Sequence, residues 1–246
     1  MAEPKPMPRL FLVRHGETEW TRNGYVPVSH SLAYYFFLLR INVLACRRHT
    51  GRSDIPLLPE GEEAIKTRAP VLVGQGKLLD PDNICQAFVS PRFRSRRTFE
   101  LLFADVPNQP PHTFTEEVRE WDYGDYEGLT PNEIKQKDRY WSIWRTGCPG
   151  GESAEEMTKR VDAVIDQVQE YHRRYFEEGI GKRDVLIVSH GHFSRVMIAR
   201  WVQFPMSLGT HFNFEPAGIA ILSYNHRNLK EPALNALNLN ADHKIH

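Results

Sequence analysis

An arginine and a histidine follow the first apolar run of the chain, and together they could perform phosphoryl chemistry. Residues 10–13 are typical of a short buried strand, and Arg14 and His15 come next, directly before Gly16. An imidazole can attack phosphorus, whereas a guanidinium presents a planar set of N–H donors to phosphoryl oxygens. The pair therefore predicts a nucleophile that faces an anion at the carboxyl end of a strand.

A second strand end repeats this design far along the chain. Residues 185–188 form another apolar run, which is followed by Ser189, His190 and Gly191 and then by a helical pattern. Such a turn places main-chain N–H groups and the positive end of a helix beside His190. A lone histidine at a strand end is more often a cap or a core residue. Two of them, one preceded by arginine, favour a common ligand site at the edge of an α/β sheet.

Five segments, taken together, resemble the histidine phosphatase superfamily, also called the phosphoglycerate mutase-like family. The resemblance covers roughly residues 8–225, and its finer detail is most similar to the fungal sedoheptulose-1,7-bisphosphatase branch, through residues 120–129 and 141–148. It implies an α/β three-layer sandwich whose mainly parallel sheet has helices on both faces. The five segments are 14–20, 90–95, 119–128, 150–153 and 189–192.

The resemblance also implies a role for individual residues. His15 would carry the phosphoryl group, Arg14, Arg94 and His190 would surround its oxygens, and Glu120 would be the acid/base. It implies neither a metal nor another cofactor, and the partner is a small phosphorylated sugar. The residues that would bind substrate or phosphate are Thr21, Asn23, Thr50, Gly51, Arg92 and Gly191.

Strands and helices alternate along the sequence, which favours a mainly parallel sheet covered on both faces. Besides residues 10–13, we predict strands at 84–89, 113–118, 184–189 and 218–223, and helices at 60–73, 94–103, 152–177 and 193–202. The helix from 152 is the strongest, because Ser153 and Glu156 form a capping-box pattern before an apolar stripe. We expect one domain at 8–225, with loose termini at 1–7 and 226–246.

Composition excludes some classes of partner. The 246 residues contain 31 Lys and Arg and 31 Asp and Glu, so no overall field attracts nucleic acid or an anionic membrane. The three cysteines have no metal-ligand spacing, and their odd number argues against a disulfide framework. With a polar, proline-rich start, this predicts a cytoplasmic protein without membrane attachment. The sequence leaves open whether the chain is a monomer or a homo-oligomer.

Residues 25–47 do not fit the family pattern. Family members usually pass from Asn-Gly directly to His-Thr-Gly, but here Gly24 and His49 are far apart. The apolar run 32–39 is shorter than the about 20 residues that span a membrane, which leaves a surface excursion or, as we prefer, a retained intron in the gene model. Transcripts that uniformly contain these codons would exclude the intron. A real insertion would splay the loop that holds Thr21, Asn23 and Thr50.

Three functions remain from the sequence. Only about two dozen residues separate Gly128 from Gly150, so the helical cover found in mutases is short, which favours a phosphatase over a phosphoglycerate mutase-type phosphotransferase. The alternative outside catalysis is an impaired pseudo-phosphatase whose loop the insertion has broken. The arginines in 92–97, together with Arg145, could bind a second phosphate of a sugar bisphosphate such as sedoheptulose 1,7-bisphosphate.

Overall fold

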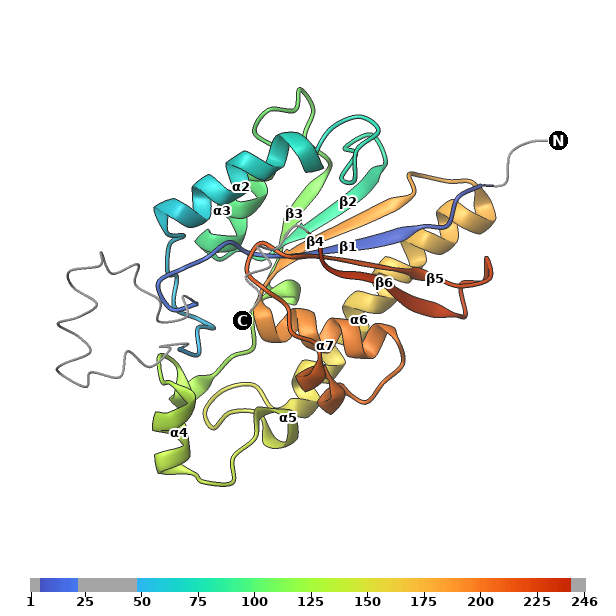
Figure 1. Ribbon diagram of the computed structural model, residues 1–246. Coiled ribbons are helices and arrows are strands. Elements are labelled where there is room, and N and C mark those ends of the chain that lie inside the picture. The colour runs from blue at the N-terminus through green and yellow to red at the C-terminus, as the bar shows by residue number, and fades with distance from the viewer. Residues whose placement is uncertain (1–4, 22–47, 240–246) are drawn as a thin grey trace.

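A six-stranded sheet organises the described residues, 5–21 and 48–239, of the computed structural model (Figure 1). Its strand order is β3-β2-β4-β1-β5-β6. The strands are β1 (Arg9–Arg14), β2 (Ile84–Val89), β3 (His112–Phe114), β4 (Asp184–Ser189), β5 (Ile219–Tyr224) and β6 (Pro232–Leu239). The helices are α2 (Pro59–Leu72), α3 (Phe93–Leu102), α4 (Pro131–Lys137), α5 (Ile143–Thr146), α6 (Ala154–Arg173) and α7 (Gly191–Trp201). Short helical turns are η1 (Glu116–Val118), η2 (Gly124–Tyr126), η3 (Arg174–Glu178) and η4 (Met206–His211).

The two central strands, β1 and β4, run parallel and end at the same edge of the sheet. Arg14, the last residue of β1, lies opposite Ser189, the last residue of β4. β2 continues the parallel part beside β4 and is followed by β3, whereas β5 and β6 are antiparallel. Because the register brings these strand ends together, His15 and His190 leave the sheet side by side.

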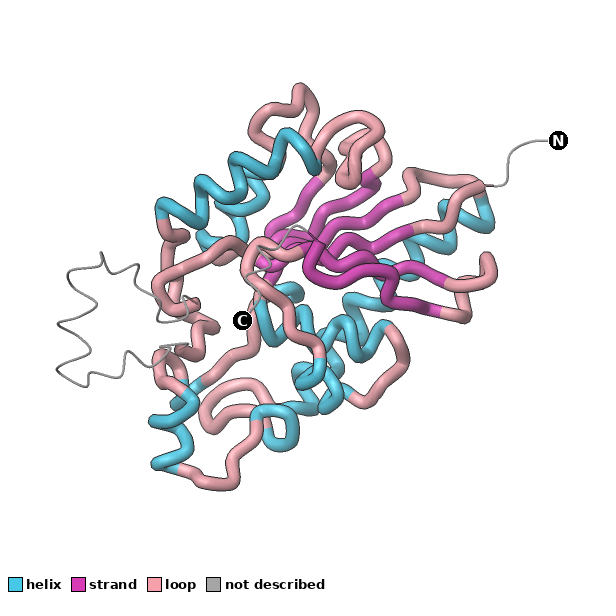
Figure 2. Tube along the Cα trace, viewed as in Figure 1, coloured by secondary structure: helices cyan, strands magenta, loops and turns pink. Residues whose placement is uncertain are grey.

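Helices cover both faces of the sheet, as Figure 2 shows along the Cα trace. Alternate side chains of β1 point to opposite sides, as a pleated strand requires. Leu10 and Leu12 belong to the core under α6 and α7, whereas Phe11 and Val13 belong to the core under α2 and α3. This confirms the predicted three-layer α/β sandwich, with a sheet that is parallel in its β3–β1 half.

The capping box predicted at the start of the long helix is present in α6. The Ser153 side chain accepts from the Glu156 N–H at 3.1 Å, and the Glu156 carboxylate accepts from the Ser153 N–H at 2.8 Å. Val161, Val164 and Val168 of its apolar stripe are buried. The α-helix ends at Arg173 and continues as the π-type turn η3.

Two predictions of local structure need correction. The strand expected at 113–118 ends at Phe114, because the Thr115 hydroxyl accepts from the Glu117 N–H and starts η1 instead. The loose terminus expected from residue 226 is wrong for β6, which pairs antiparallel with β5. The turn between them is closed by hydrogen bonds from Asn225 and Asn228 to Glu231, so the strand is pinned to the sheet. Its asparagines hid this strand from an apolar pattern.

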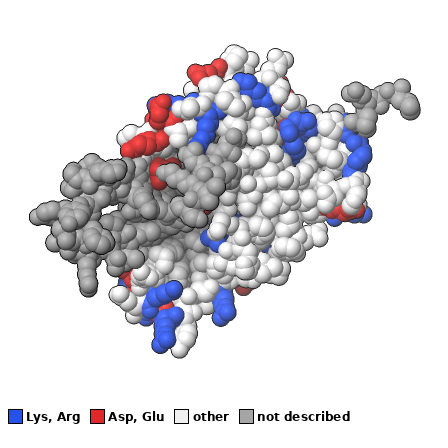
Figure 3. All heavy atoms as spheres, in the orientation of Figure 1, with Lys and Arg blue, Asp and Glu red and all other residues white. Residues whose placement is uncertain are grey.

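The segment 25–47 lies outside the described residues, so the intron hypothesis stays a prediction. The residues that flank it meet, because the Arg48 N–H donates to the Trp20 carbonyl at 3.2 Å. Within the described ranges, no helix has the length and apolar character needed to cross a membrane. On the face drawn in Figure 3, side chains of both signs lie interspersed along the upper margin, in accord with the equal totals.

Candidate active site

A cavity of about 280 Å³ lies at the carboxyl ends of β1 and β4. This is the position at which open α/β sheets usually bind ligands. It brings together most of the residues that the sequence predicted for the site. Those on its wall are Arg14, His15, Thr21, Thr50, Arg94, Glu120 and Gly191.

His15 is held as a neutral imidazole with one nitrogen directed to chemistry. Its Nδ1 lies 2.7 Å from the Gly16 carbonyl oxygen, an acceptor, so Nδ1 carries the proton and Nε2 keeps its lone pair. The side chain is almost fully buried. Burial, and then the positive charges of Arg94 and Arg14, lower the pKa of His15 well below its ordinary value of 6.5. A neutral Nε2 is the form that can act as a nucleophile.

Arg14 and Gly191 lie against each other across the two strand ends. The Arg14 guanidinium donates to the Phe214 carbonyl, which fixes it at the cavity wall. A Cβ added to Gly191 would lie 3.4 Å from three atoms of this guanidinium. The glycine therefore lets the start of α7 approach the arginine closely.

The Glu120 carboxylate is bound entirely by main-chain donors. Oε1 accepts from the Trp121 N–H at 2.9 Å and from the Phe193 N–H at 2.8 Å, and Oε2 accepts from the His192 N–H at 3.0 Å. The last two donors belong to the first turn of α7, which no side chain of its own caps. Glu120 thus supplies an acceptor for the first N–H groups of this helix, and it lines the same cavity as Arg14.

Arg94 is bound by a loop that follows the undescribed segment. One Nη donates to the Ser53 carbonyl at 2.7 Å, and the other to the Thr50 carbonyl at 3.0 Å. The Glu127 carboxylate holds the same loop from its other side, because it accepts from the N–H groups of Gly51 and Ser53. A phosphoryl group that binds Arg94 would compete with these carbonyls for its Nη groups.

His190 is buried beside Arg94 and does not reach the cavity wall. Its Nδ1 accepts from Arg94 Nε at 3.2 Å, so the neutral ring carries its proton on Nε2, which lies 2.7 Å from the Ser90 hydroxyl. Burial and then the charge of Arg94 lower the pKa of His190 well below its ordinary value. The ring lies edge-on to His15, with centroids 5.1 Å apart. Here it orients Arg94.

Two of the predicted binding residues, Arg92 and Gly51, do not line this cavity. Arg92 and Gly51 line a neighbouring cavity of about 270 Å³, and Arg92 forms a bidentate ion pair with Glu116 at 3.0 and 3.1 Å. Asn23 lies outside the described residues. Thr21 does line the main cavity, where its hydroxyl accepts from the Thr18 N–H at 2.8 Å.

The far wall of the cavity was not predicted in full. His49 and His192 both line it, with stacked rings whose centroids are 6.0 Å apart. Tyr123 and Arg195 were missed. The Tyr123 hydroxyl lies 2.7 Å from His192 Nδ1. Arg195 could have been found from its spacing, because it follows Gly191 by four residues and so shares its face of α7.

Burial favours the uncharged forms of the three rings on this far wall, those of His49, Tyr123 and His192. It lowers the pKa of His49, and it lowers that of His192 well below the ordinary value, with a further contribution from Arg195. It also raises the pKa of Tyr123. Within residues 5–21 and 48–239, no three His, Cys, Asp or Glu side chains are grouped to hold a metal ion.

Comparison with known proteins gives consistent relatives. The family model of the histidine phosphatase superfamily (branch 1) matches residues 10–237. Sedoheptulose 1,7-bisphosphatase of Saccharomyces cerevisiae is 30% identical over 94% of this chain and 93% of its own length. An acid phosphatase of Mycobacterium tuberculosis is 36% identical over 89% of this chain and 87% of its own. The solved structure of an open reading frame product of Mycobacterium tuberculosis has a TM-score of 0.71 and 32% identity, and covers 94% of this chain and 97% of its own.

The matched range contains both strand ends that bear histidine, the Glu120 loop and most of β6. The relatives that match nearly end to end are both named as phosphatases. The chain therefore belongs to branch 1 of the histidine phosphatase superfamily and is a phosphoric monoester hydrolase.

Proposed function

We propose that the protein hydrolyses a sugar bisphosphate through a phosphohistidine at His15, and that its substrate is sedoheptulose 1,7-bisphosphate. The observation that carries the mechanism is the hydrogen bond from His15 Nδ1 to the Gly16 carbonyl, which leaves a neutral Nε2 in a cavity that also holds Arg14 and Glu120. Phosphate monoesters hydrolyse extremely slowly without a catalyst, so dividing the reaction at a covalent intermediate lowers the barrier.

In the first step His15 Nε2 attacks phosphorus and the bond from phosphorus to the ester oxygen breaks. The departing alkoxide takes a proton from the Glu120 carboxyl. In the second step water attacks the phosphoryl group, loses a proton to the Glu120 carboxylate, and releases His15 when the phosphorus–nitrogen bond breaks. The main-chain donors of Trp121, His192 and Phe193 hold the Glu120 carboxyl in one place for both steps.

Arginines compensate the charge of the group that is transferred. Arg14 is fixed at the cavity wall beside Gly191, and its guanidinium can accompany the phosphoryl group through both steps. Arg94 joins it when the phosphoryl oxygens replace the carbonyls of Thr50 and Ser53. His190 then keeps Arg94 oriented through Nε.

The far wall supports a substrate with a second phosphate. Arg195 and Arg48, which also pairs with Glu133, line the cavity together with the rings of His49, His192 and Tyr123, a combination suited to a phosphorylated sugar. The name of the yeast relative supplies the particular sugar.

Arg145, which the sequence suggested for the distal phosphate, does not line the cavity and is exposed on α5. Arg195 is the better candidate, because its guanidinium is held on η4 by the Gly209 and Thr210 carbonyls and lies 5.0 Å from the centre of the Trp144 ring.

One observation favours the second candidate function, a catalytically impaired binding module. The contacts of Arg94 with the carbonyls of Thr50 and Ser53 occupy the guanidinium that the transferred group needs. If residues 25–47 keep this loop in place, phosphate would not displace it.

The test is release of inorganic phosphate from sedoheptulose 1,7-bisphosphate in excess chelator, with the His15→Ala variant and a matched His211→Ala control on exposed η4. We expect release that is lost with His15 and kept with His211. Release that survives His15→Ala would overturn the phosphohistidine. A chain without residues 25–47 that alone releases phosphate would show the impaired module. If that chain too is inactive on this sugar but active on others, the substrate assignment is wrong.

A further inference from the structure

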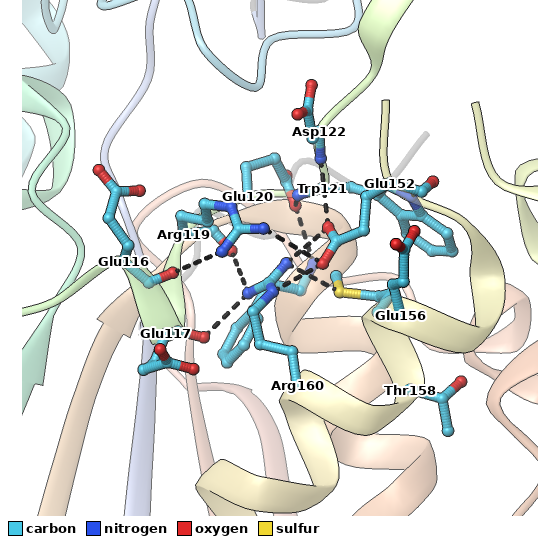
Figure 4. Close-up of polar contacts among 12 residues, drawn as sticks. Glu116, Glu117, Arg119, Glu120, Trp121, Asp122, Glu152, Glu156, Thr158 and Arg160 are labelled. Atoms are coloured by element: carbon cyan, nitrogen blue, oxygen red, sulfur yellow. Dashed lines mark hydrogen bonds and ion pairs between the residues drawn. The ribbon is translucent and has the colours of Figure 1, made fainter. Parts of the chain in front are cut away.

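A buried ion pair outside the cavity braces the loop that carries Glu120. Arg160 of α6 and Glu152, just before that helix, face each other with side chains 7% and 5% exposed. Arg160 Nε lies 2.8 Å from Glu152 Oε1, and Nη2 lies 2.8 Å from Oε2, which is a bidentate pairing (Figure 4). Neither residue lines the cavity that contains His15.

The arginine binds the chain on the amino side of Glu120. Its remaining Nη1 donates to the Glu117 carbonyl at 2.9 Å and to the Arg119 carbonyl at 3.0 Å. Figure 4 shows Arg160 reaching from α6 towards this turn. One guanidinium therefore ties the residue immediately before Glu120 to the long helix.

The glutamate binds the chain on the carboxyl side. Its Oε2 accepts from the Asp122 N–H at 3.3 Å, and its main chain exchanges a further bond, from the Glu152 N–H to the Asp122 carbonyl at 2.9 Å. The Trp121 indole N–H donates to the Glu152 carbonyl at 2.8 Å. Glu120 is thus held between two clamped neighbours, and α7 receives its carboxylate.

A buried ion pair is a poor source of stability, because the cost of removing both charges from water offsets most of their attraction. Its other hydrogen bonds are concentrated on the residues around Glu120: Nη1 donates to the Glu117 and Arg119 carbonyls, and the carboxylate accepts from the Asp122 N–H and, at 3.4 Å, from Arg119 Nη2. The geometry fits a device that sets where the acid/base carboxyl lies.

We propose that Glu152 and Arg160 are positioning residues for Glu120, an inference that rests on the acid/base role proposed above. If the clamp is lost, His15 still attacks phosphorus, but the proton no longer reaches the departing alkoxide. The loss must then depend on how much the leaving group needs a proton, which a general loss of folding would not produce.

The experiment compares kcat/KM for sedoheptulose 1,7-bisphosphate and for 4-nitrophenyl phosphate, whose leaving group departs as an anion. For Arg160→Met and Glu152→Gln we expect the sugar value to fall about 100-fold, within the range of general acid–base catalysis. The aryl value should fall by less than about threefold, with a burst of one nitrophenolate per enzyme before slow turnover. The matched control is Asp162→Ala, which breaks the Arg200–Asp162 pair between α6 and α7 at 2.8 Å and should leave both values unchanged.

Glu120→Gln separates the positioning role from the acid/base role. If it shows the same leaving-group dependence and Arg160→Met lowers both substrates equally, the positioning role is overturned and the role of Glu120 stands. If Glu120→Gln itself lowers both substrates equally, the acid/base assignment fails. Should Arg160→Met not fold, Arg160→Lys keeps the charge but not the bidentate fork, and it must show the same selective loss on the sugar for the proposal to hold.

Discussion

His15 and Glu120 are held by main-chain groups of the sheet edge and α7, whereas Arg94 is held by carbonyls of the loop 50–53. His15 and Glu120 form what we call the preset wall of the cavity, because each of their hydrogen bonds can persist when phosphate binds. On the other side, Arg94 donates to the Ser53 and Thr50 carbonyls with the Nη groups that phosphate requires. The proposed acid/base is therefore already in position without a ligand, whereas a phosphoryl group must displace loop carbonyls from Arg94 before that arginine can bind it.

The largest effect should come from removing the nucleophile on the preset wall. We expect His15→Asn to lower kcat/KM for phosphate release by at least ~10³-fold, because the proposed covalent intermediate forms on His15 Nε2. Denaturing gels kept at alkaline pH should show an acid-labile phosphoprotein band with labelled substrate in the parent chain, and this band should be lost in the variant. A band that persists would place the phosphoryl group on another residue.

Arg94→Lys tests the wall that works by exchange. A lysine cannot present a planar fork of N–H donors to two phosphoryl oxygens, so we expect a loss of about 100-fold in kcat/KM. Arg92→Lys is the matched control, since Arg92 pairs with Glu116 in the neighbouring cavity. We expect it to lose less than about threefold. Equal losses would show that both arginines serve the phosphate.

Glu127→Gln loosens the loop without touching His15. The carboxylate accepts from Gly51 and Ser53, and hydrogen bonds to a charged group contribute about 1.5–3 kcal/mol. If the loop competes with phosphate for Arg94, releasing the loop should lower KM by about tenfold while kcat changes little. Initial rates over a range of substrate concentrations would show this. A fall in kcat alone would make the loop part of the preset wall.

The pH dependence of activity should also reflect the preset wall. Burial and two arginines keep the pKa of His15 well below 6.5, so His15 stays in its neutral, nucleophilic form as pH falls below that value. We therefore expect kcat/KM to show no acid limb near pH 6.5 from this residue. An acid limb near pH 6.5 that is traced to protonation of His15 would contradict this electrostatic environment.

The smallest effect on activity, and a reference far from both walls, is expected at His172. Burial lowers its pKa to about 4, from an ordinary 6.5, and its Nδ1 lies 2.9 Å from the Tyr224 hydroxyl. Between pH 6.5 and 4 the unfolded chain binds a proton at His172 that the folded chain does not. The free energy of unfolding therefore decreases by about 3 kcal/mol as the pH is lowered from 6.5 to 4. Urea unfolding of His172→Gln should show a shallower decline over this window, and exposed His226→Gln should not.

The sequence was sufficient for the features that depend on strands alone. Arg14 ends β1, His15 directly follows it, and Gly191 comes two residues after the end of β4, so their convergence needs only the register of these adjacent parallel strands. Arg92 and Arg94 show the opposite case. They are two residues apart at the start of α3, a spacing that turns side chains to different sides of a helix, and only the fold reveals which one meets the cavity.

Partners within the loops were also beyond prediction. The sequence placed Glu120 near phosphate, but not on the N–H groups of α7, because that contact joins residues more than 70 positions apart. β6 was missed since its asparagines break the apolar alternation, although Leu234 and Leu237 pack on the core.

The hydrogen bond between Arg48 and Trp20 has a consequence for how this lineage can change. Because the Arg48 N–H meets the Trp20 carbonyl, these two positions are adjacent in space, whatever number of residues the chain carries between them. Closing a flexible loop costs only about 0.6 kcal/mol more for each doubling of its length. Insertions and deletions at this one junction are therefore nearly neutral for folding, and a new segment can enter the gene there and be tested by selection on its contents alone.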